Sequence, residues 1–265
     1  MLIDTHTHLY LPEFDAEGLT GADAVDRALE AGIDRMIFPN VDLTTIEPMR
    51  RLHEQRPDVT FMAMGLHPTE INEGWREDLE ATREELESHS ADYIAIGEIG
   101  IDLYWDKKFA EQQMQALEQQ MQWAAARKLP VIIHCREGLP QTLEVLSEFP
   151  EATGVMHSFG GTPEDVEAVK RTVDFYFGIN GIVTFKNSRL VDTLPAIGTG
   201  RLLLETDSPY LAPVPKRGKR NESAYLVHTA ARVASALGLT PDNLASITPP
   251  TPSLSFLSPN PYGDI

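Results

Sequence analysis

The sequence predicts an α/β fold of the (β/α)8 type, a TIM barrel, because strand-like and helix-like segments alternate eight times along its 265 residues. Domains of this type typically have about 250 residues. Histidines and acidic residues follow several of the strand-like segments, and active sites of such barrels lie at the carboxyl ends of the strands. Length, alternation and the placement of these polar residues therefore predict the fold and the position of a site together.

The predicted strands are short and rich in Ile, Val, Leu, Met and Phe. Near-continuous apolar runs of this kind are typical of strands that are buried on both faces of a parallel sheet. We expect them at residues 2–6, 33–39, 59–66, 93–99, 130–135, 152–158, 174–179 and 200–206.

The segments between these strands have helical composition, and the longest is rich in Glu, Gln, Met, Ala and Lys. We expect helices at residues 21–31, 44–55, 74–88, 108–128, 139–148, 163–171, 189–196 and 223–237. A doubly wound open sheet is the alternative, but no Gly-rich phosphate loop follows the first strand. Residues 1–247 are thus expected to form the barrel, and residues 248–265, with five prolines, a Pro-rich tail that cannot sustain a helix.

Composition limits the possible functions and locations of the protein. A formal net charge of −18 argues against broad nucleic-acid binding through a basic surface, although bound metal ions can still attract a nucleic acid. The single Cys135 excludes an internal disulfide, which fits a reducing compartment. With no long apolar stretch and with Asp4 and His6 near the start, the chain has neither a predicted membrane span nor a signal peptide, so we expect a cytoplasmic protein.

Candidate metal ligands begin with His6 and His8, which are two residues apart and therefore project from the same face of a strand. Glu98 lies in a run that should be buried, where a carboxylate is costly unless it is paired or bound to metal. A structural salt bridge is the alternative, but no basic residue lies within five positions of Glu98. A carboxylate at this position can also bridge two ions.

His134 and His157 each end an apolar run, and their equivalent positions in successive units favour metal binding over two unrelated buried histidines. Asp207 and Glu205 share one strand face, so one can bind metal while the other orients a neighbouring group. Asp207 can also accept a proton from a bound water. His67 follows the third strand and is a candidate substrate contact, or a loop histidine that bonds only to backbone.

The densest basic cluster of this acidic chain follows the eighth strand and should overhang the same end of the barrel. A solvated loop is the ordinary explanation, but its position and sign favour contact with phosphate groups. Its basic residues are Lys216, Arg217, Lys219 and Arg220.

Seven short motifs, in this order along the chain, resemble those of the TatD-like metal-dependent deoxyribonucleases, a branch of the amidohydrolase-like barrels. The resemblance runs from Met1 to about Ile247. The motifs are Asp4-Thr5-His6-Thr7-His8, Gly65-Leu66-His67-Pro68, Gly97-Glu98-Ile99-Gly100-Ile101-Asp102, His134-Cys135-Arg136-Glu137, His157-Ser158-Phe159-Gly160-Gly161, Glu205-Thr206-Asp207-Ser208-Pro209-Tyr210 and Arg217-Gly218-Lys219-Arg220-Asn221-Glu222.

The resemblance implies two divalent metal ions and assigns ligands to each. One ion would bind His6, His8, Glu98 and Asp207, and the other Glu98, His134 and His157. The imidazole-rich set suits Zn or Mn, whereas the family is commonly described as Mg-dependent. Glu205 would lie beside the ligands or on the substrate side.

The implied reaction is hydrolysis of DNA phosphodiester bonds, of the exonuclease type, by water activated between the two ions. Glu98, Asp207 and Glu205 are the expected catalytic residues, and His67 and Arg136 are expected to contact the substrate beside the basic loop. The expected partner is DNA, as single strands or ends, and we expect a monomer with no obligate protein partner. Two alternatives stay open: hydrolysis of a small-molecule ester, amide or phosphotriester at the same site, and a metal-loaded binding protein.

Two features depart from the family pattern. Ser223 stands where such proteins often have proline, and the Pro-rich tail replaces a closing helix. Loss of that helix would affect stability more than chemistry, because all six candidate ligands lie upstream of the tail.

The excess of acidic residues, with 7 Lys among 22 basic residues, is also typical of proteins adapted to high intracellular salt. If this interpretation is right, screening of the net charge by molar salt stabilises the fold. We therefore expect the thermal midpoint to fall when molar KCl is removed, as followed by circular dichroism. A midpoint that is independent of salt would contradict the interpretation.

Overall fold

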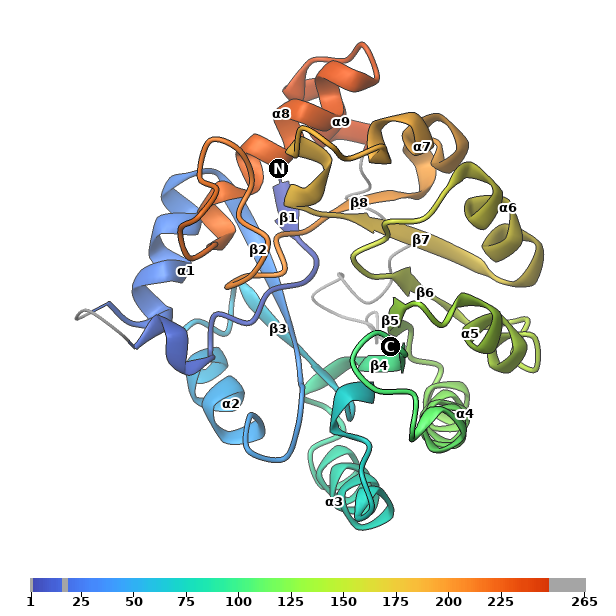
Figure 1. The fold of residues 1–265 in the computed structure, drawn as a ribbon. Coiled ribbons are helices and arrows are strands. Elements are labelled where there is room, and N and C mark those ends of the chain that lie inside the picture. The colour runs from blue at the N-terminus through green and yellow to red at the C-terminus, as the bar shows by residue number, and fades with distance from the viewer. Residues whose placement is uncertain (1, 16–18, 248–265) are drawn as a thin grey trace, which may run out of the picture.

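The computed structural model describes residues 2–15 and 19–247, and its centre is one parallel sheet of eight strands that follow each other in chain order (Figure 1). All eight predicted strands are present. They are β1 (Leu2–Asp4), β2 (Ile33–Pro39), β3 (Thr60–Met64), β4 (Tyr93–Asp102), β5 (Val131–Arg136), β6 (Thr153–Met156), β7 (Asp174–Ile179) and β8 (Leu202–Leu204).

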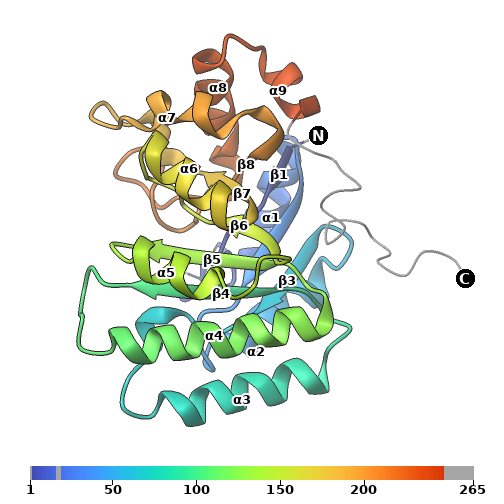
Figure 2. The ribbon, with the colours of Figure 1, turned by 90° about the vertical axis from the view of Figure 1, so that its right-hand side faces the viewer.

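Helices surround the sheet, with α2, α3 and α4 on one side of the molecule and α7, α8 and α9 on the opposite side (Figure 2). The fold is the predicted (β/α)8 barrel. The helices are α1 (Gly21–Glu30), α2 (Ile46–Gln55), α3 (Trp75–Ser88), α4 (Ala110–Arg127), α5 (Leu139–Leu146), α6 (Pro163–Thr172), α7 (Leu190–Ile197), α8 (Leu226–Ala236) and α9 (Pro241–Ile247). In the part of the chain that the structure describes, no helix is long and apolar enough to cross a membrane.

Helix α9 was not predicted from the sequence. The Thr240 hydroxyl accepts a hydrogen bond from the Asn243 amide, and Pro241 occupies the first helical position, so the start of the helix has a recognisable cap. Leu244 is fully buried where α9 packs against α8. The predicted Pro-rich tail, residues 248–265, lies outside the described residues.

The first and last strands meet through hydrogen bonds at their carboxyl ends. The Thr5 amide donates to the Leu204 carbonyl (3.1 Å), and the Asp207 amide donates to the His6 carbonyl (2.9 Å). The buried Asp4 carboxylate accepts hydrogen bonds from the amide (2.9 Å) and the hydroxyl (2.6 Å) of Thr206. Burial outweighs these bonds and raises the pKa of Asp4 to about 7. The barrel is therefore joined beside two of the candidate ligand segments.

A layer of buried apolar side chains comes from six strands and from no helix, so it fills the interior of the barrel. Its members are Ile37, Ala63, Ala95, Ile132, Val155 and Leu203. Ile132 precedes His134 by two residues in β5, and Val155 in β6 precedes His157, directly after that strand, by two, so each pair points to the same face. The apolar layer thus lies directly beneath candidate ligands inside the barrel.

Replacing Ile132 by alanine should leave a cavity in this apolar layer. We expect the free energy of unfolding to fall by about 2–5 kcal/mol, the range for removing several buried methyl groups. Urea denaturation of metal-stripped protein measures the change. Leu29→Ala, at a side chain that is 38 % exposed, is the control and should change the free energy by less than about 0.5 kcal/mol. Equal effects of the two substitutions would contradict this description of the interior.

Candidate metal centre

The structure brings all six predicted ligands together at the carboxyl end of the barrel. His6 and His8 follow β1, Glu98 and His134 lie within β4 and β5, and His157 comes directly after β6. Asp207 follows β8 by three residues. Each of these strands is held by its neighbours in the sheet, so the polar side chains project from a rigid rim.

Glu98 lies at the centre of this group, and its side chain is only 3 % exposed. Its Oε2 is 3.0 Å from His6 Nε2 and 3.7 Å from His8 Nε2. Its Oε1 is 2.9 Å from His134 Nδ1 and 3.7 Å from His157 Nε2. Oε2 thus faces His6 and His8, whereas Oε1 faces His134 and His157 together with His67, so both oxygens of the carboxylate are surrounded by imidazoles, as a bridging ligand requires.

Asp207 completes one side of the group. Its Oδ1 lies 3.9 Å from His6 Nε2, 3.7 Å from His8 Nε2 and 3.8 Å from His157 Nε2. The backbone of Asp207 has φ 57°, in the left-handed region that non-glycine residues adopt at a cost. This turn directs the carboxylate at three imidazole nitrogens.

His67 was expected to contact only the substrate or the backbone, but it lies among the candidate ligands. Its Nε2 is 3.3 Å from Glu98 Oε1 and 3.2 Å from His134 Nδ1. Among the described residues, three groups have ligand atoms close enough together to hold a metal ion. These are His6 with Glu98 and His157, His6 with His8 and Asp207, and His67 with Glu98 and His134. The assignment of ligands to individual ions stays a prediction.

Burial and mutual attraction set the charges of these groups. Burial lowers the pKa of His8 to about 4 and that of His6 well below its usual value, which leaves both as neutral imidazoles. Burial would raise the pKa of Glu98, but attraction by the surrounding histidines holds it well below its usual range. Imidazoles around a charged carboxylate form a donor set that fits a divalent ion such as Zn or Mn.

His157 and Asp207 shift in the opposite direction. Burial disfavours charge on His157, but Glu205, Glu98 and Asp207 outweigh burial and raise its pKa to about 10. Burial raises the pKa of Asp207 to about 7. Metal ions compete with protons for such groups, so binding would release a proton from His157.

Several residues support the candidate ligands from behind. Glu205 is fully buried, its Oε1 accepts a hydrogen bond from the Ser158 amide (2.6 Å), and the same oxygen lies 3.0 Å from His157 Nδ1. Gly178 leaves the space for this carboxylate, because a Cβ there would overlap Glu205 Oε2. The structure therefore places Glu205 against a ligand's ring, away from the other imidazoles' Nε2 atoms.

Sequence reasoning did not single out two further supporting residues. Asp102 Oδ2 lies 2.9 Å from His134 Nε2, and the Tyr10 hydroxyl lies 2.8 Å from His8 Nδ1. Tyr10 also donates a hydrogen bond to the Pro39 carbonyl. Asp102 ends the motif that begins at Gly97, which could have marked it. Only the position of Tyr10, two residues after His8, distinguishes it in the sequence. Contacts of this kind fix the orientation of a ligand's ring.

The basic loop lies between β8 and α8, and its cations rest on aromatic rings. Lys216 lies 4.7 Å from the ring centre of Tyr225, and Arg217 lies 3.8 Å from that of Phe185. Arg220 lies over Phe14, and Lys219 is exposed. Their contact with phosphate groups stays a prediction, as does that of Arg136.

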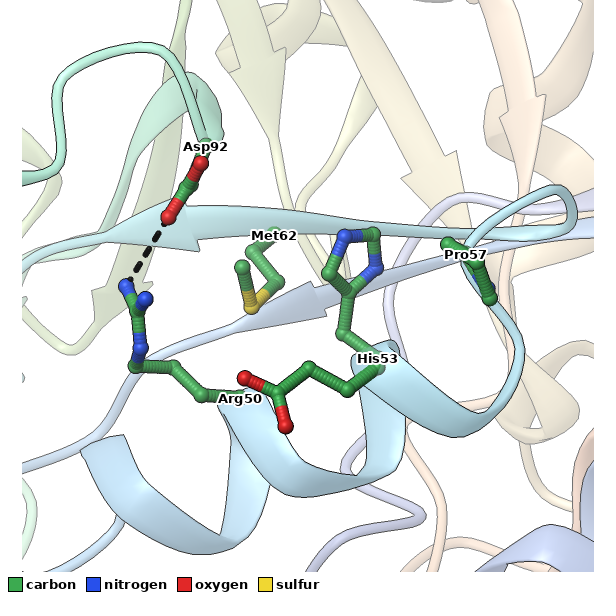
Figure 3. Close-up of a pocket in the computed structure, with 6 residues that line it drawn as sticks. Arg50, His53, Pro57, Met62 and Asp92 are labelled. Carbon is green, nitrogen blue, oxygen red and sulfur yellow. Dashed lines mark ion pairs between the residues drawn. The ribbon is translucent and has the colours of Figure 1, made fainter.

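A cavity of about 360 Å³ lies elsewhere in the barrel (Figure 3). Met62 stands between Arg50 and His53 in this cavity, and Arg50 pairs with Asp92 at 3.1 Å. Asp92 precedes β4 and His53 is near the end of α2, so the cavity is at the amino ends of the strands. It is therefore separate from the candidate metal centre.

Comparison with known proteins identifies the family of the chain. A sequence model of the family described as TatD related DNase matches residues 3–252. An uncharacterized metal-dependent hydrolase, YabD of Bacillus subtilis, is 35 % identical over 251 residues, which cover 94 % of this chain and 96 % of YabD. A protein of Pantoea vagans named 3'-5' ssDNA/RNA exonuclease TatD is 34 % identical, covering 84 % of this chain and 87 % of that protein.

A solved structure of a TatD homolog has the same fold. The crystal structure of YJJV, a TatD homolog from Escherichia coli K12, superposes with a TM-score of 0.85 at 26 % identity and covers 97 % of each chain. The chain therefore belongs to the TatD related DNase family of metal-dependent hydrolases.

Proposed function

We propose that the protein hydrolyses phosphodiester bonds of DNA, removing nucleotides from single-stranded ends. The observation that carries this proposal is the position of Glu98, one of whose oxygens faces His6 and His8 and the other His134, His67 and His157. A carboxylate placed in this way suits two divalent ions. The name of the Pantoea vagans relative, a 3'-5' ssDNA/RNA exonuclease, supports the choice of substrate.

The ligands proposed for one ion are His6, His8, Glu98 and Asp207, and those for the other are Glu98, His134 and His157. His67 lies beside the second set, 3.3 Å from Glu98 Oε1. Two bound divalent ions would supply a water of lowered pKa and would stabilise negative charge on the phosphate oxygens.

Residues of the chain are proposed to bind the phosphates of the substrate, to orient a ligand's ring and to accept a proton. Asp207, whose Oδ1 faces the imidazoles of His6, His8 and His157, can orient a water and accept its proton. Glu205 holds the His157 ring so that Nε2 faces Glu98 and Asp207. Arg136 and the basic loop are the proposed contacts to the phosphates on either side of the scissile bond.

Hydrolysis of a small-molecule ester, amide or phosphotriester is the second candidate. The net charge of −18 favours it, because such a protein repels polyanions at long range. The basic loop beside the site opposes it.

Replacing Glu98 by alanine should lower cleavage of end-labelled single-stranded DNA by at least about 100-fold, because both ions lose a shared ligand. Metal-stripped protein is assayed with Mg, Mn or Zn added back. Glu54→Ala, in the cavity at the opposite end of the barrel, should keep the wild-type rate. Retention of near-wild-type cleavage by the Glu98 variant, or hydrolysis of small esters in place of DNA by the wild-type protein, would refute the proposal.

Replacing Gly178 by alanine should displace the Glu205 carboxylate and release the His157 ring. Loss of such an orienting contact typically weakens metal binding by about 10- to 100-fold, which calorimetric titration of metal-stripped protein can measure. Gly200→Ala is the matched control, because a Cβ at Gly200 meets no atom within 4 Å. Equal metal affinity of the two variants would show that Glu205 does not position His157.

A further inference from the structure

Exposed aromatic side chains gather at one end of the molecule. Among the Phe, Trp and Tyr residues that the structure describes, three are exposed: Tyr104 (48 %), Trp105 (73 %) and Tyr210 (51 %). Tyr104 and Trp105 follow β4, and Tyr210 follows β8, so all three lie on segments that leave the carboxyl ends of ligand-bearing strands. Contiguous exposed apolar surface with polar residues at its rim marks a site for a partner or a ligand, and Tyr104 and Trp105 are adjacent in the chain.

The pair Tyr104 and Trp105 is connected directly to the candidate metal centre. The Tyr104 amide donates a hydrogen bond to Asp102 Oδ1 (3.0 Å), while Asp102 Oδ2 lies 2.9 Å from His134 Nε2. One carboxylate thus contacts both a candidate ligand and the backbone that carries the aromatic pair. The backbone that carries the two rings is therefore tied to a carboxylate beside the candidate ligands.

A cation completes this group. Arg136 ends β5, two residues after His134, and its guanidinium carbon lies 3.6 Å from the ring centre of Tyr104 and 5.4 Å from that of Trp105. The rings of Tyr104 and Trp105 are 4.8 Å apart and almost perpendicular, at 87°. Because the two rings do not stack in parallel, aromatic surface is left for a flat ligand.

We propose that Tyr104, Trp105 and Arg136 form a stacking platform for single-stranded nucleic acid. A base stacks on Trp105, Arg136 contacts an adjacent phosphate, and the strand continues to the metal centre. Exposed aromatic rings with a neighbouring cation are how proteins bind unpaired strands with little sequence preference. A base inside a duplex offers no free face, so the platform selects single strands. This inference rests on the nuclease function proposed above.

The test compares Trp105→Ala and Trp105→Phe with the wild-type protein on two substrates. One is an oligothymidylate, and the other is the same strand with abasic residues near the cleaved end. Loss of base stacking should raise KM for the oligothymidylate about 10-fold or more, with kcat little changed, and phenylalanine should restore most of the loss. On the abasic strand the three proteins should behave alike. Leu29→Ala, at the far end of α1, serves as the surface control.

A binding measurement separates this inference from the nuclease proposal. Mn²⁺-loaded protein is titrated into a fluorescein-labelled phosphorothioate oligothymidylate, and anisotropy is followed. Binding that depends on Trp105, without cleavage of any DNA, would refute the nuclease function and leave the platform standing. Cleavage and binding unchanged in Trp105→Ala would overturn the platform alone. Dissociation of a wild-type dimer by Trp105→Ala on size exclusion would also overturn it, since Trp105 would then belong to a subunit contact.

Discussion

A buried carboxylate, that of Glu98, is the interaction on which the rest of the site depends. Removal of a charged carboxylate from water costs several kcal/mol unless nearby groups compensate for it. Here the compensation comes from imidazoles on different parts of the barrel, with His6 and His8 after β1, His134 in β5 and His157 after β6. The charge is therefore tolerable only when the barrel is closed, and the fold and the site depend on each other.

Side chains alternate between the two faces of a strand, so packing inside the barrel also sets where the candidate ligands point. Ile132, Val155 and Leu203 fill the interior, and His134, His157 and Glu205 follow them by two residues on the same face. A shift of one residue in any of these strands would turn the polar side chain toward the outer helices and place an apolar side chain at the site. Apolar packing thus fixes the positions of the ligands more firmly than contacts among the ligands themselves can.

The alternation of strands and helices was predictable because both faces of each strand are buried, which leaves continuous apolar runs such as Val131–Ile133. The ligands followed from their position at strand ends. The environment of His67 was not predictable, because the turn Pro68–Glu70 decides where that loop places its ring. The positions of Tyr10 and of the exposed pair Tyr104–Trp105 were not predictable for the same reason. Periodicity locates strand ends but does not specify the path of the loops that leave them.

The acidity of the chain and a polyanionic substrate are compatible if the positive charge is local and unpaired. Among the residues that the structure describes, Lys216, Arg217 and Arg220 form no ion pair with a carboxylate and lie instead over aromatic rings. A ring face holds a cation in place without neutralising it, so the charge stays available to phosphate. A local group of cations can therefore attract phosphate even though the chain as a whole carries a net charge of −18.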